Sequence, residues 1–266
     1  MMSGEKRSIR PVIELVTHCY AVRHPGYAAA LRYQLSSLVF LHSRHCDIIC
    51  TVCYTKSDRL TKAVVNQFMD KVDISGVSYQ SISMKTEELG RRCIGRNKAA
   101  LKSKADIVWF TDVDHVFLPP CMDALIQLEW PKDALLIYPK KIMIHKDHDL
   151  GDDYLSREPK HWLFAWIDIQ DFIVKDYDRP VGGVQIVRGD TARKYGYLNT
   201  PDTLKNKWHK PTNNPFSSFK DDVTFRKLMK EEGGVCGVEF DGVYRLRHTH
   251  VTYPAKQKPI PRGING

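Results

Sequence analysis

The sequence predicts an α/β protein with a mostly parallel central sheet flanked by helices. Short apolar runs alternate with stretches whose apolar residues recur at helical spacing over residues 12–120. The run 107–110 is apolar throughout, which is typical of a strand buried on both faces. The chain has 266 residues and is 42% hydrophobic, so it is long enough for one large domain with a sizeable core.

The elements follow in order. Before residue 120, the apolar runs predict strands at 12–16, 48–54, 77–82 and 107–110, and the spacing predicts helices at 27–38, 60–68 and 97–104. Pro119 and Pro120 break this alternation. The second half is expected to be less regular, with strands at 135–138 and 184–187, a helix at 222–230, a long excursion over 141–180, and a strap or disordered tail after 253. No linker divides the chain.

The charge balance is basic. Forty Lys and Arg against 31 Asp and Glu give a net charge of +9, and the basic residues cluster at 91–104, 205–210 and 245–262. Such a protein favours polyanionic partners, whether nucleic acid, acidic glycan, membrane surface or nucleotide, although the same charge also serves solubility.

Cysteine usage and the N-terminus bear on location. Seven cysteines at irregular spacing predict free thiols in a reducing compartment. The His and Cys residues of 42–53 do not have the spacing of a zinc site and are better explained as a strand with buried cysteines. Residues 1–11 lack the apolar core of a signal peptide, and no apolar run approaches the ~20 residues of a membrane span. We expect a cytoplasmic protein.

Two carboxylates, Asp112 and Asp114, follow the strand 107–110 directly. Ligands in open α/β sheets bind beyond the carboxyl ends of the strands. Alternate residues of extended chain point to the same side, so both carboxylates can face one ion. Mg²⁺ or Mn²⁺ commonly bridges protein carboxylates to a diphosphate. An Asp-rich turn is the structural alternative.

The stretch GRNKAALKSKADIVWFTDVDHVF resembles the core of the family-2-like GT-A glycosyltransferases, which use nucleotide sugars and carry a D-x-D motif. Asp112 and Asp114 match that motif. The segment VGGVQIVRGD, with Gly182 and Gly183, resembles the glycine-containing loop and strand that face the acceptor. The resemblance covers about residues 12–250. It implies a single domain over 1–266, with a nucleotide-sugar half at about 12–120, an acceptor and catalytic half at about 121–250, and a tail at 251–266.

Two later motifs complete the resemblance. KDDVTFRKLM places Asp221 and Asp222 at the start of a late helix, where the family has an acidic pair whose second member is often the catalytic base. The pair here is Asp-Asp rather than the commoner Glu-Asp, and helix capping is the alternative reading. RLRHTH offers His248 and His250 for the late histidine of the metal site.

The resemblance implies transfer of a sugar from a nucleotide diphosphate, with UDP as the first guess, to an acceptor hydroxyl. Mn²⁺ or Mg²⁺ would be held by Asp112, Asp114 and a late histidine, although Asp112 could instead bind ribose or the metal through water. Arg96, then Arg92 or Lys98, would add positive charge at the nucleotide. Asp222, or else Asp221, would be the base, which implies inversion at the anomeric carbon.

Further candidates for the nucleotide base and ribose are Thr17, His18 and Tyr20 after the first strand, and Asp58 after the second. Tyr20 could stack on the base. Turn residues are polar in any case, so each of these positions also has a purely structural explanation.

The acceptor is open at this point. The +9 charge suits a hydroxymethylated pyrimidine in DNA as the acceptor. Some virus-encoded transferases glycosylate such bases. A virus-encoded enzyme of this kind would act in a host cytoplasm. A glycan or lipid-linked acceptor is the alternative. A nucleotidyltransferase would need a Gly-rich loop after the first strand, and THCYAVRHPGY has none. A non-catalytic nucleic-acid-binding module would explain the charge but not the ordered acidic sites. Oligomeric state is not predicted.

Overall fold

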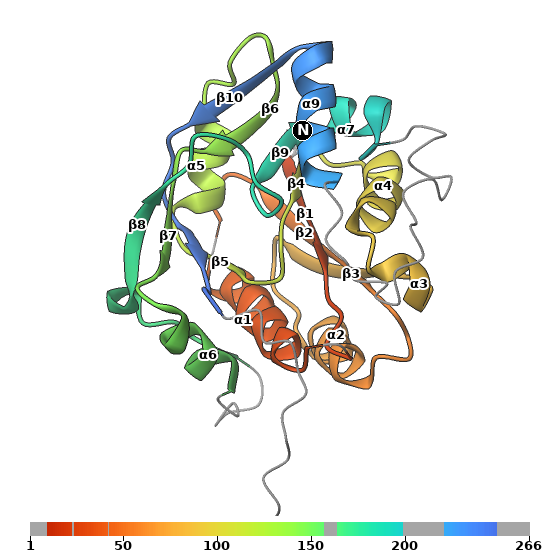
Figure 1. Ribbon diagram of the computed structural model, residues 1–266, viewed down its shortest axis with the longest axis vertical. Helices are drawn as coiled ribbons and strands as arrows, with labels where there is room; N and C mark the ends of the chain where they lie inside the picture. The colour runs from red at the N-terminus through yellow and green to blue at the C-terminus, as the bar shows by residue number, and fades with distance from the viewer. Residues whose placement is uncertain (1–9, 23, 42, 157–163, 199–220, 249–266) are drawn as a thin grey trace, which may run out of the picture.

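The computed structural model describes residues 10–22, 24–41, 43–156, 164–198 and 221–248. Within them, one sheet has seven strands in the order β10-β6-β9-β4-β1-β2-β3, and a smaller sheet has the order β5-β11-β7-β8 (Figure 1). The strands are β1 Val12–His18, β2 Asp47–Tyr54, β3 Val77–Ser83, β4 Ile107–Phe110, β5 His115–Phe117, β6 Ala134–Pro139, β7 Lys141–His145, β8 Phe172–Asp176, β9 Gln185–Arg188, β10 Gly234–Val238 and β11 Val243–Arg245.

The helices flank these sheets. They are α1 Gly26–Leu41, α2 Arg59–Lys71, α3 Thr86–Leu89, α4 Arg92–Lys102, α5 Cys121–Gln127, α6 His148–Ser156, α7 Gly189–Tyr195 and α9 Asp221–Glu232, with a 3₁₀ turn η1 at Ile169–Asp171. No helix of the described residues is long and apolar enough to cross a membrane.

The central sheet is mostly parallel, as predicted. Strands β3, β2, β1 and β4 run parallel, β9 runs antiparallel between β4 and β6, and β6 and β10 are again parallel. The carboxyl ends of β1 and β4 therefore lie at one edge of the sheet. From β4 the chain passes through residues 111–114 into β5 of the smaller sheet, so the D-x-D motif joins the two sheets.

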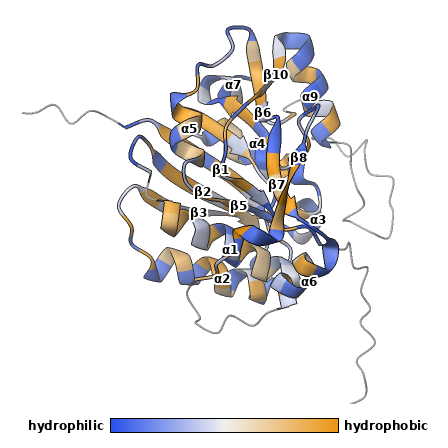
Figure 2. Cartoon of the chain, turned by 90° about the vertical axis from the view of Figure 1, so that its left-hand side faces the viewer, coloured by the Kyte–Doolittle hydropathy of each residue, from blue (hydrophilic) through white to orange (hydrophobic). Residues whose placement is uncertain are grey.

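Helices cover both faces of the central sheet, and alternate strand residues divide between two apolar cores. Leu15 and Trp109 pack in the core that α1 and α2 share. Val108 and Phe110 pack in the core of the opposite face, where Phe225 of α9 joins them. Figure 2 shows apolar residues concentrated on these strands and on the inner sides of the helices. This double burial explains why 107–110 is apolar throughout.

The region 141–180 is more regular than predicted. It supplies β7 and β8 to the smaller sheet, and part of the acidic stretch 147–153 forms the start of α6. The Oδ1 of Asp147 accepts a hydrogen bond from the amide of Leu150 at 2.8 Å, and Tyr154 is buried, so a cap and an apolar contact favour the helix.

Trp166 lies outside any helix and packs edge-on against Phe40 at 5.1 Å. One smaller expectation also needs correction. The helix expected at 97–104 begins earlier, at Arg92. All seven cysteines are free thiols, as predicted, and the tail after 253 lies outside the described residues.

Candidate active site

The backbone of the D-x-D motif is held from both sides. Gln34, fully buried on α1, donates from Nε2 to the carbonyl of Asp112 at 2.8 Å. The carbonyl of Asp114 accepts from the amide of Leu246 at 2.8 Å, just after β11. Two elements far apart in sequence therefore fix the backbone that presents the two carboxylates.

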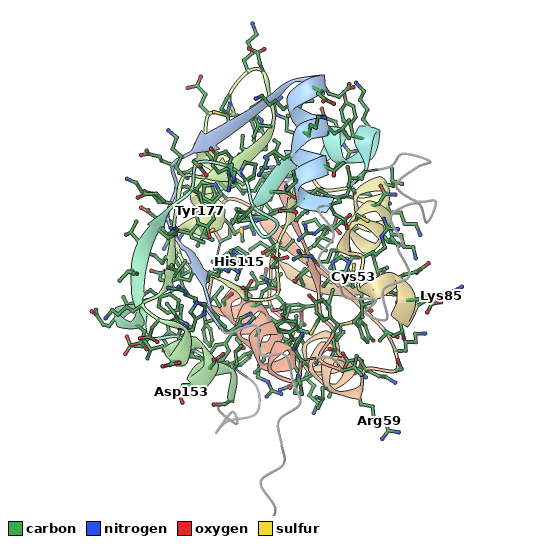
Figure 3. The ribbon with its side chains drawn as sticks, viewed as in Figure 1. Cys53, Arg59, Lys85, His115, Asp153 and Tyr177 are labelled. Atoms are coloured by element: carbon green, nitrogen blue, oxygen red, sulfur yellow. The ribbon has the colours of Figure 1, made fainter. Side chains whose placement is uncertain are left out.

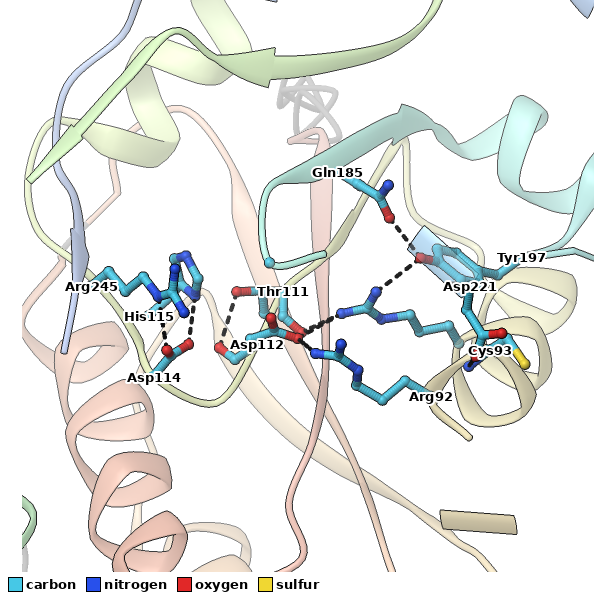
Figure 4. A network of polar contacts seen from close by, with 12 residues as sticks. Arg92, Cys93, Thr111, Asp112, Asp114, His115, Gln185, Tyr197, Asp221 and Arg245 are labelled. Atoms are coloured by element: carbon cyan, nitrogen blue, oxygen red, sulfur yellow. Dashed lines mark hydrogen bonds and ion pairs between the residues drawn. The ribbon is translucent and has the colours of Figure 1, made fainter. Parts of the chain in front are cut away.

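Arginines of α4 surround the Asp112 carboxylate. Arg92 pairs with Oδ1, and the Nη2 of Arg96 lies 3.0 Å from the same oxygen (Figure 4). Arg96 is 1% exposed. Burial acts to raise the pKa of Asp112, but the charges of Arg92 and Arg96 outweigh it and hold that pKa below its usual value. Arg92 and Arg96, which were predicted to add positive charge at the nucleotide, thus contact Asp112.

The Asp114 carboxylate turns toward the smaller sheet. Its Oδ2 accepts from the Nε of Arg245 at 2.9 Å, and its Oδ1 lies 3.1 Å from the Nδ1 of His115. The Nε2 of His248 is 3.9 Å from Oδ2. Burial alone would raise the pKa of Asp114, yet Arg245, His115 and His248 together hold it well below its usual value. The two carboxylates therefore face different basic groups.

The predicted glycine pair lies against the residues around both carboxylates, with Gly182 beside Asp112 and Gly183 beside His115. A Cβ on Gly182 would be 3.6 Å from Nη2 of Arg92, 3.6 Å from Oδ2 of Asp112 and 3.7 Å from Cβ of Asp222. A Cβ on Gly183 would be 2.3 Å from Cε1 of His115, closer than real contacts allow. The loop before β9 thus approaches the D-x-D motif closely because it lacks side chains.

The acidic pair begins α9, and its two members differ in place. Asp221 accepts from the amide of Cys93 at 3.4 Å through Oδ2, so it turns toward the first turn of α4. Asp222 lies beside Gly182, near Asp112. A helix start lacks intrahelical acceptors for its first amides, and an acidic side chain there suits both capping and the helix dipole.

Thr17 and His18, expected after the first strand, are instead the last two residues of β1. Thr17 and His18 are buried, and neither the Thr17 hydroxyl nor the two His18 ring nitrogens has a hydrogen-bond partner among the described residues. His18 packs against Gly95 of α4. A Cβ on Gly95 would lie 2.2 Å from its Nε2. Burial and the charges of Arg96 and Arg92 lower the pKa of His18 well below its usual value.

An aromatic series connects this loop to the late histidine. The rings of Tyr20 and Tyr27 are 5.0 Å apart, and those of Tyr27 and His248 are 5.5 Å apart. Burial raises the pKa of Tyr20. The charge of Arg92 acts to lower this pKa, and the charges of Asp112 and Asp114 act to raise it further, so the ring lies close enough to the motif to feel its charges.

Two predicted residues, Lys98 and Asp58, are not brought to the carboxylates. Lys98 pairs with Glu88 of α3 at 2.8 Å, on another face of α4 from Arg92. Asp58 caps α2, accepting from the amide of Thr61 at 3.1 Å, and its other oxygen accepts from the amide of Val22, which fixes the loop after β1. His250 lies outside the described residues.

Several site residues were missed at the level of sequence. Tyr197 and Gln185 join Arg96 to α9 through buried hydrogen bonds (Figure 4). Gln185 carried a signal, because it is a polar residue inside an apolar strand. His115 and Arg245 were also missed, although both adjoin quoted motifs. Figure 3 shows His115 near the centre of the molecule, between the two sheets.

Comparisons with known proteins agree with this architecture. No known family model matches the sequence, and no curated protein matches it. Its structure is similar to that of S. aureus TarS 1-349 in complex with UDP, with a TM-score of 0.54 and 12% identity, covering 87% of this chain and 59% of that one. It is also similar to the mannosyltransferase PcManGT from Pyrobaculum calidifontis in complex with GDP-Man and Mn²⁺, with a TM-score of 0.52 and 11% identity, covering 89% and 57%.

These similarities confirm the predicted fold, a glycosyltransferase fold of the GT-A type. The chain spans less than two thirds of the length of either structure.

Proposed function

We propose that this protein is a glycosyltransferase that moves a sugar from a nucleotide diphosphate sugar to an acceptor hydroxyl. The observation that carries the proposal is the meeting of Asp112, Arg92 and Asp222 around the bare backbone of Gly182. These residues come from three separate parts of the chain, the D-x-D motif, the start of α4 and the acidic pair of α9, and a structural turn would not require them to converge. We assign donor binding to about residues 12–120 and acceptor binding and catalysis to about 121–250.

A metal ion would bind beside the donor diphosphate. Among the described residues no group of three or more His, Cys, Asp or Glu side chains is arranged for a metal. Of the predicted ligands in the described part of the chain, Asp114 and His248 would hold the ion, because their Oδ2 and Nε2 lie 3.9 Å apart. Diphosphate oxygens and water would complete the shell of Mg²⁺ or Mn²⁺. Such an ion stabilises the charge that develops on the leaving diphosphate.

The protein's own cations have a related task. Arg92 and Arg96 hold two positive charges beside Asp112, whose single carboxylate neutralises only one of them. The surplus charge favours a diphosphate at this point. UDP is the first nucleotide to test, since the similar TarS structure holds UDP, while the mannosyltransferase holds GDP-Man.

Proton removal falls to Asp222 rather than Asp221. Asp221 is occupied at the amide of Cys93, whereas Asp222 lies beside Gly182 at the motif. A carboxylate at this place takes the proton of the acceptor hydroxyl as the oxygen attacks the anomeric carbon, and the nucleotide diphosphate leaves. Single displacement inverts the anomeric configuration.

For the acceptor, we propose a hydroxymethylated pyrimidine in DNA, on the ground of the net charge of +9. A glycan or lipid-linked acceptor is the competing possibility. Duplex DNA that carries the base should bind with an affinity that falls steeply with salt, whereas salt-insensitive binding would exclude DNA as the acceptor.

The deciding experiment is thermal unfolding with UDP, GDP, CDP and dTDP, each with Mn²⁺ or with EDTA. A ligand that binds only the folded protein, at a concentration of 100 times its Kd, adds about 2.7 kcal/mol to the free energy of unfolding. Stabilisation by one nucleotide only with metal supports the proposal, and Asp114→Asn should abolish it. If no nucleotide stabilises the protein and DNA alone does, the non-catalytic nucleic-acid-binding module is the better description.

A further inference from the structure

A continuous series of hydrogen bonds joins the D-x-D motif to the start of α9. The Nη2 of Arg96 donates to Asp112 at 3.0 Å, and its Nη1 donates to the hydroxyl of Tyr197 at 3.0 Å. That hydroxyl donates to Oε1 of Gln185 at 2.6 Å. The Nε2 of Gln185 donates to the carbonyl of Asp222 at 3.0 Å. Figure 4 shows most of this series.

The direction of every bond in the series is determined. Arginine can only donate, so the Tyr197 hydroxyl accepts from Arg96 and gives its own proton to Gln185. Gln185 must then turn its oxygen to Tyr197 and its amide nitrogen to Asp222. Tyr197 and Gln185 are fully buried. If one bond of a buried series is broken, its donor and acceptor are left without partners. The desolvation penalty of these unpaired groups exceeds the net contribution that the bond makes to stability.

Tyr197 also contacts α9 through its ring. The ring stacks on Phe225 with centroids 4.2 Å apart and planes at 25°, and it meets Phe110 of β4 edge-on at 4.7 Å. Burial raises the pKa of Tyr197, and Arg96 opposes the rise without reversing it, so the hydroxyl keeps its proton. One side chain therefore fixes α9 both by packing and by a hydrogen bond relayed through Gln185.

The first turn of a helix is where such support matters. Its first amide groups have no intrahelical acceptor, so fewer helix bonds hold this turn and the position of its side chains depends more on outside contacts. The carbonyl that Gln185 contacts belongs to Asp222 itself. Displacing a reacting group by about 1 Å can cost about 10²-fold in rate.

We propose that Tyr197 and Gln185 are positioning residues that set Asp222 relative to a donor held at Asp112 and Arg96. The inference rests on the proposed function, since it presumes Asp222 as the base. Neither residue needs to touch the substrates. Their effect passes through buried hydrogen bonds, so it should appear in turnover rather than in donor affinity.

The test compares Tyr197→Phe and Gln185→Leu with a matched control, Tyr154→Phe. Tyr154 of α6 is 1% exposed, and its hydroxyl donates to Asp171 of η1 at 2.8 Å, away from the series. Each variant removes two hydrogen bonds of a buried side chain, so their thermal stability should fall by similar amounts. Only the first two should lower kcat, by about tenfold, with the donor KM changed less than twofold. The double variant should lose little more than either single one, because both break the same series.

A second measurement needs no turnover. Hydrogen exchange of the apo protein, read on peptides covering residues 221–232, should be faster in Tyr197→Phe and Gln185→Leu than in wild type or Tyr154→Phe. Unchanged exchange there, or a fall in kcat that Tyr154→Phe shares, would overturn the positioning role. If wild type turns over no nucleotide sugar, the proposed function fails, and the apo exchange still decides whether this series holds α9.

Discussion

The Nε of Arg245 donates a hydrogen bond to Oδ2 of Asp114 at 2.9 Å and thereby joins β11 to the second carboxylate of the D-x-D motif. Asp114 is 4% exposed and Arg245 is only partly buried. The arginine therefore balances a buried negative charge whenever no other cation is near. If a divalent cation binds Asp114 as proposed, the stability of the site should depend on that cation in a way that can be measured.

Arg245→Gln should lower the free energy of unfolding in EDTA by about 2 kcal/mol, because a buried carboxylate loses its charged donor. Mn²⁺ should then stabilise the variant more than it stabilises wild type, since the ion replaces the lost charge. Thermal unfolding with and without Mn²⁺ checks this. A cation effect equal in both proteins would show that Asp114 does not bind the ion.

The two neighbouring glycines should respond differently to alanine. Gly183→Ala places a Cβ 2.3 Å from the His115 ring, so the variant should lose about 1–3 kcal/mol of stability. Gly182→Ala meets its neighbours at 3.6 Å or more, which is ordinary contact, so it should fold normally. Its methyl group would still occupy space between Arg92 and Asp222 where substrate is expected. Unfolding and turnover, measured on both variants, test this; a strongly destabilised Gly182→Ala would contradict it.

His18 should make stability depend on pH. Its pKa in the folded protein lies well below 6.5, so below about pH 6.5 the unfolded chain binds a proton that the folded protein does not. The free energy of unfolding should therefore fall with decreasing pH, by up to about 1.4 kcal/mol per pH unit, until the pKa of folded His18 is reached. Above pH 7 the effect is absent. Denaturant unfolding of wild type and His18→Gln between pH 5 and 7.5 should show a shallower slope in the variant, and equal slopes would contradict the assignment.

The sequence predicted the central sheet well because local pattern carries that information. Unbroken apolar runs such as 107–110 identify strands buried on both faces, and their alternation with helices predicts parallel connections. The smaller sheet was missed for the opposite reason. Its strands are three to five residues long, and β11 pairs with β5 and β7 from distant parts of the chain.

For the candidate site, motifs identified the residues but not their partners. Asp112 and Asp114 follow a strand, so their place could be predicted, yet one faces α4 and the other faces β11. Which residue they contact depends on tertiary packing. Lys98 shows the limit, because helical spacing from Arg96 turns it toward Glu88. Tyr197 carries no local signal at all.

Asp222 and Asp221 can be told apart by matched substitutions, because the two side chains have the same chemistry and differ only in surroundings. Asp222→Asn should lower turnover by about 10²–10⁴-fold, the usual contribution of a general base. The nucleotide Kd should change little, since Arg92, Arg96 and Asp114 would still hold the donor. Asp221→Asn keeps an oxygen that can accept from the amide of Cys93 and loses only the negative charge there. That loss should cost less than about 1 kcal/mol of stability and leave turnover within a few-fold.

The product adds an independent check on the same assignment. A single displacement assisted by Asp222 inverts the anomeric configuration, which NMR of the first product formed can establish. A retained configuration would require another mechanism and would remove the reason for a base at α9. Loss of turnover in Asp221→Asn but not in Asp222→Asn would instead exchange the two roles. It would also mean that α9 turns when substrate binds, because Asp221 contacts α4 in this structure.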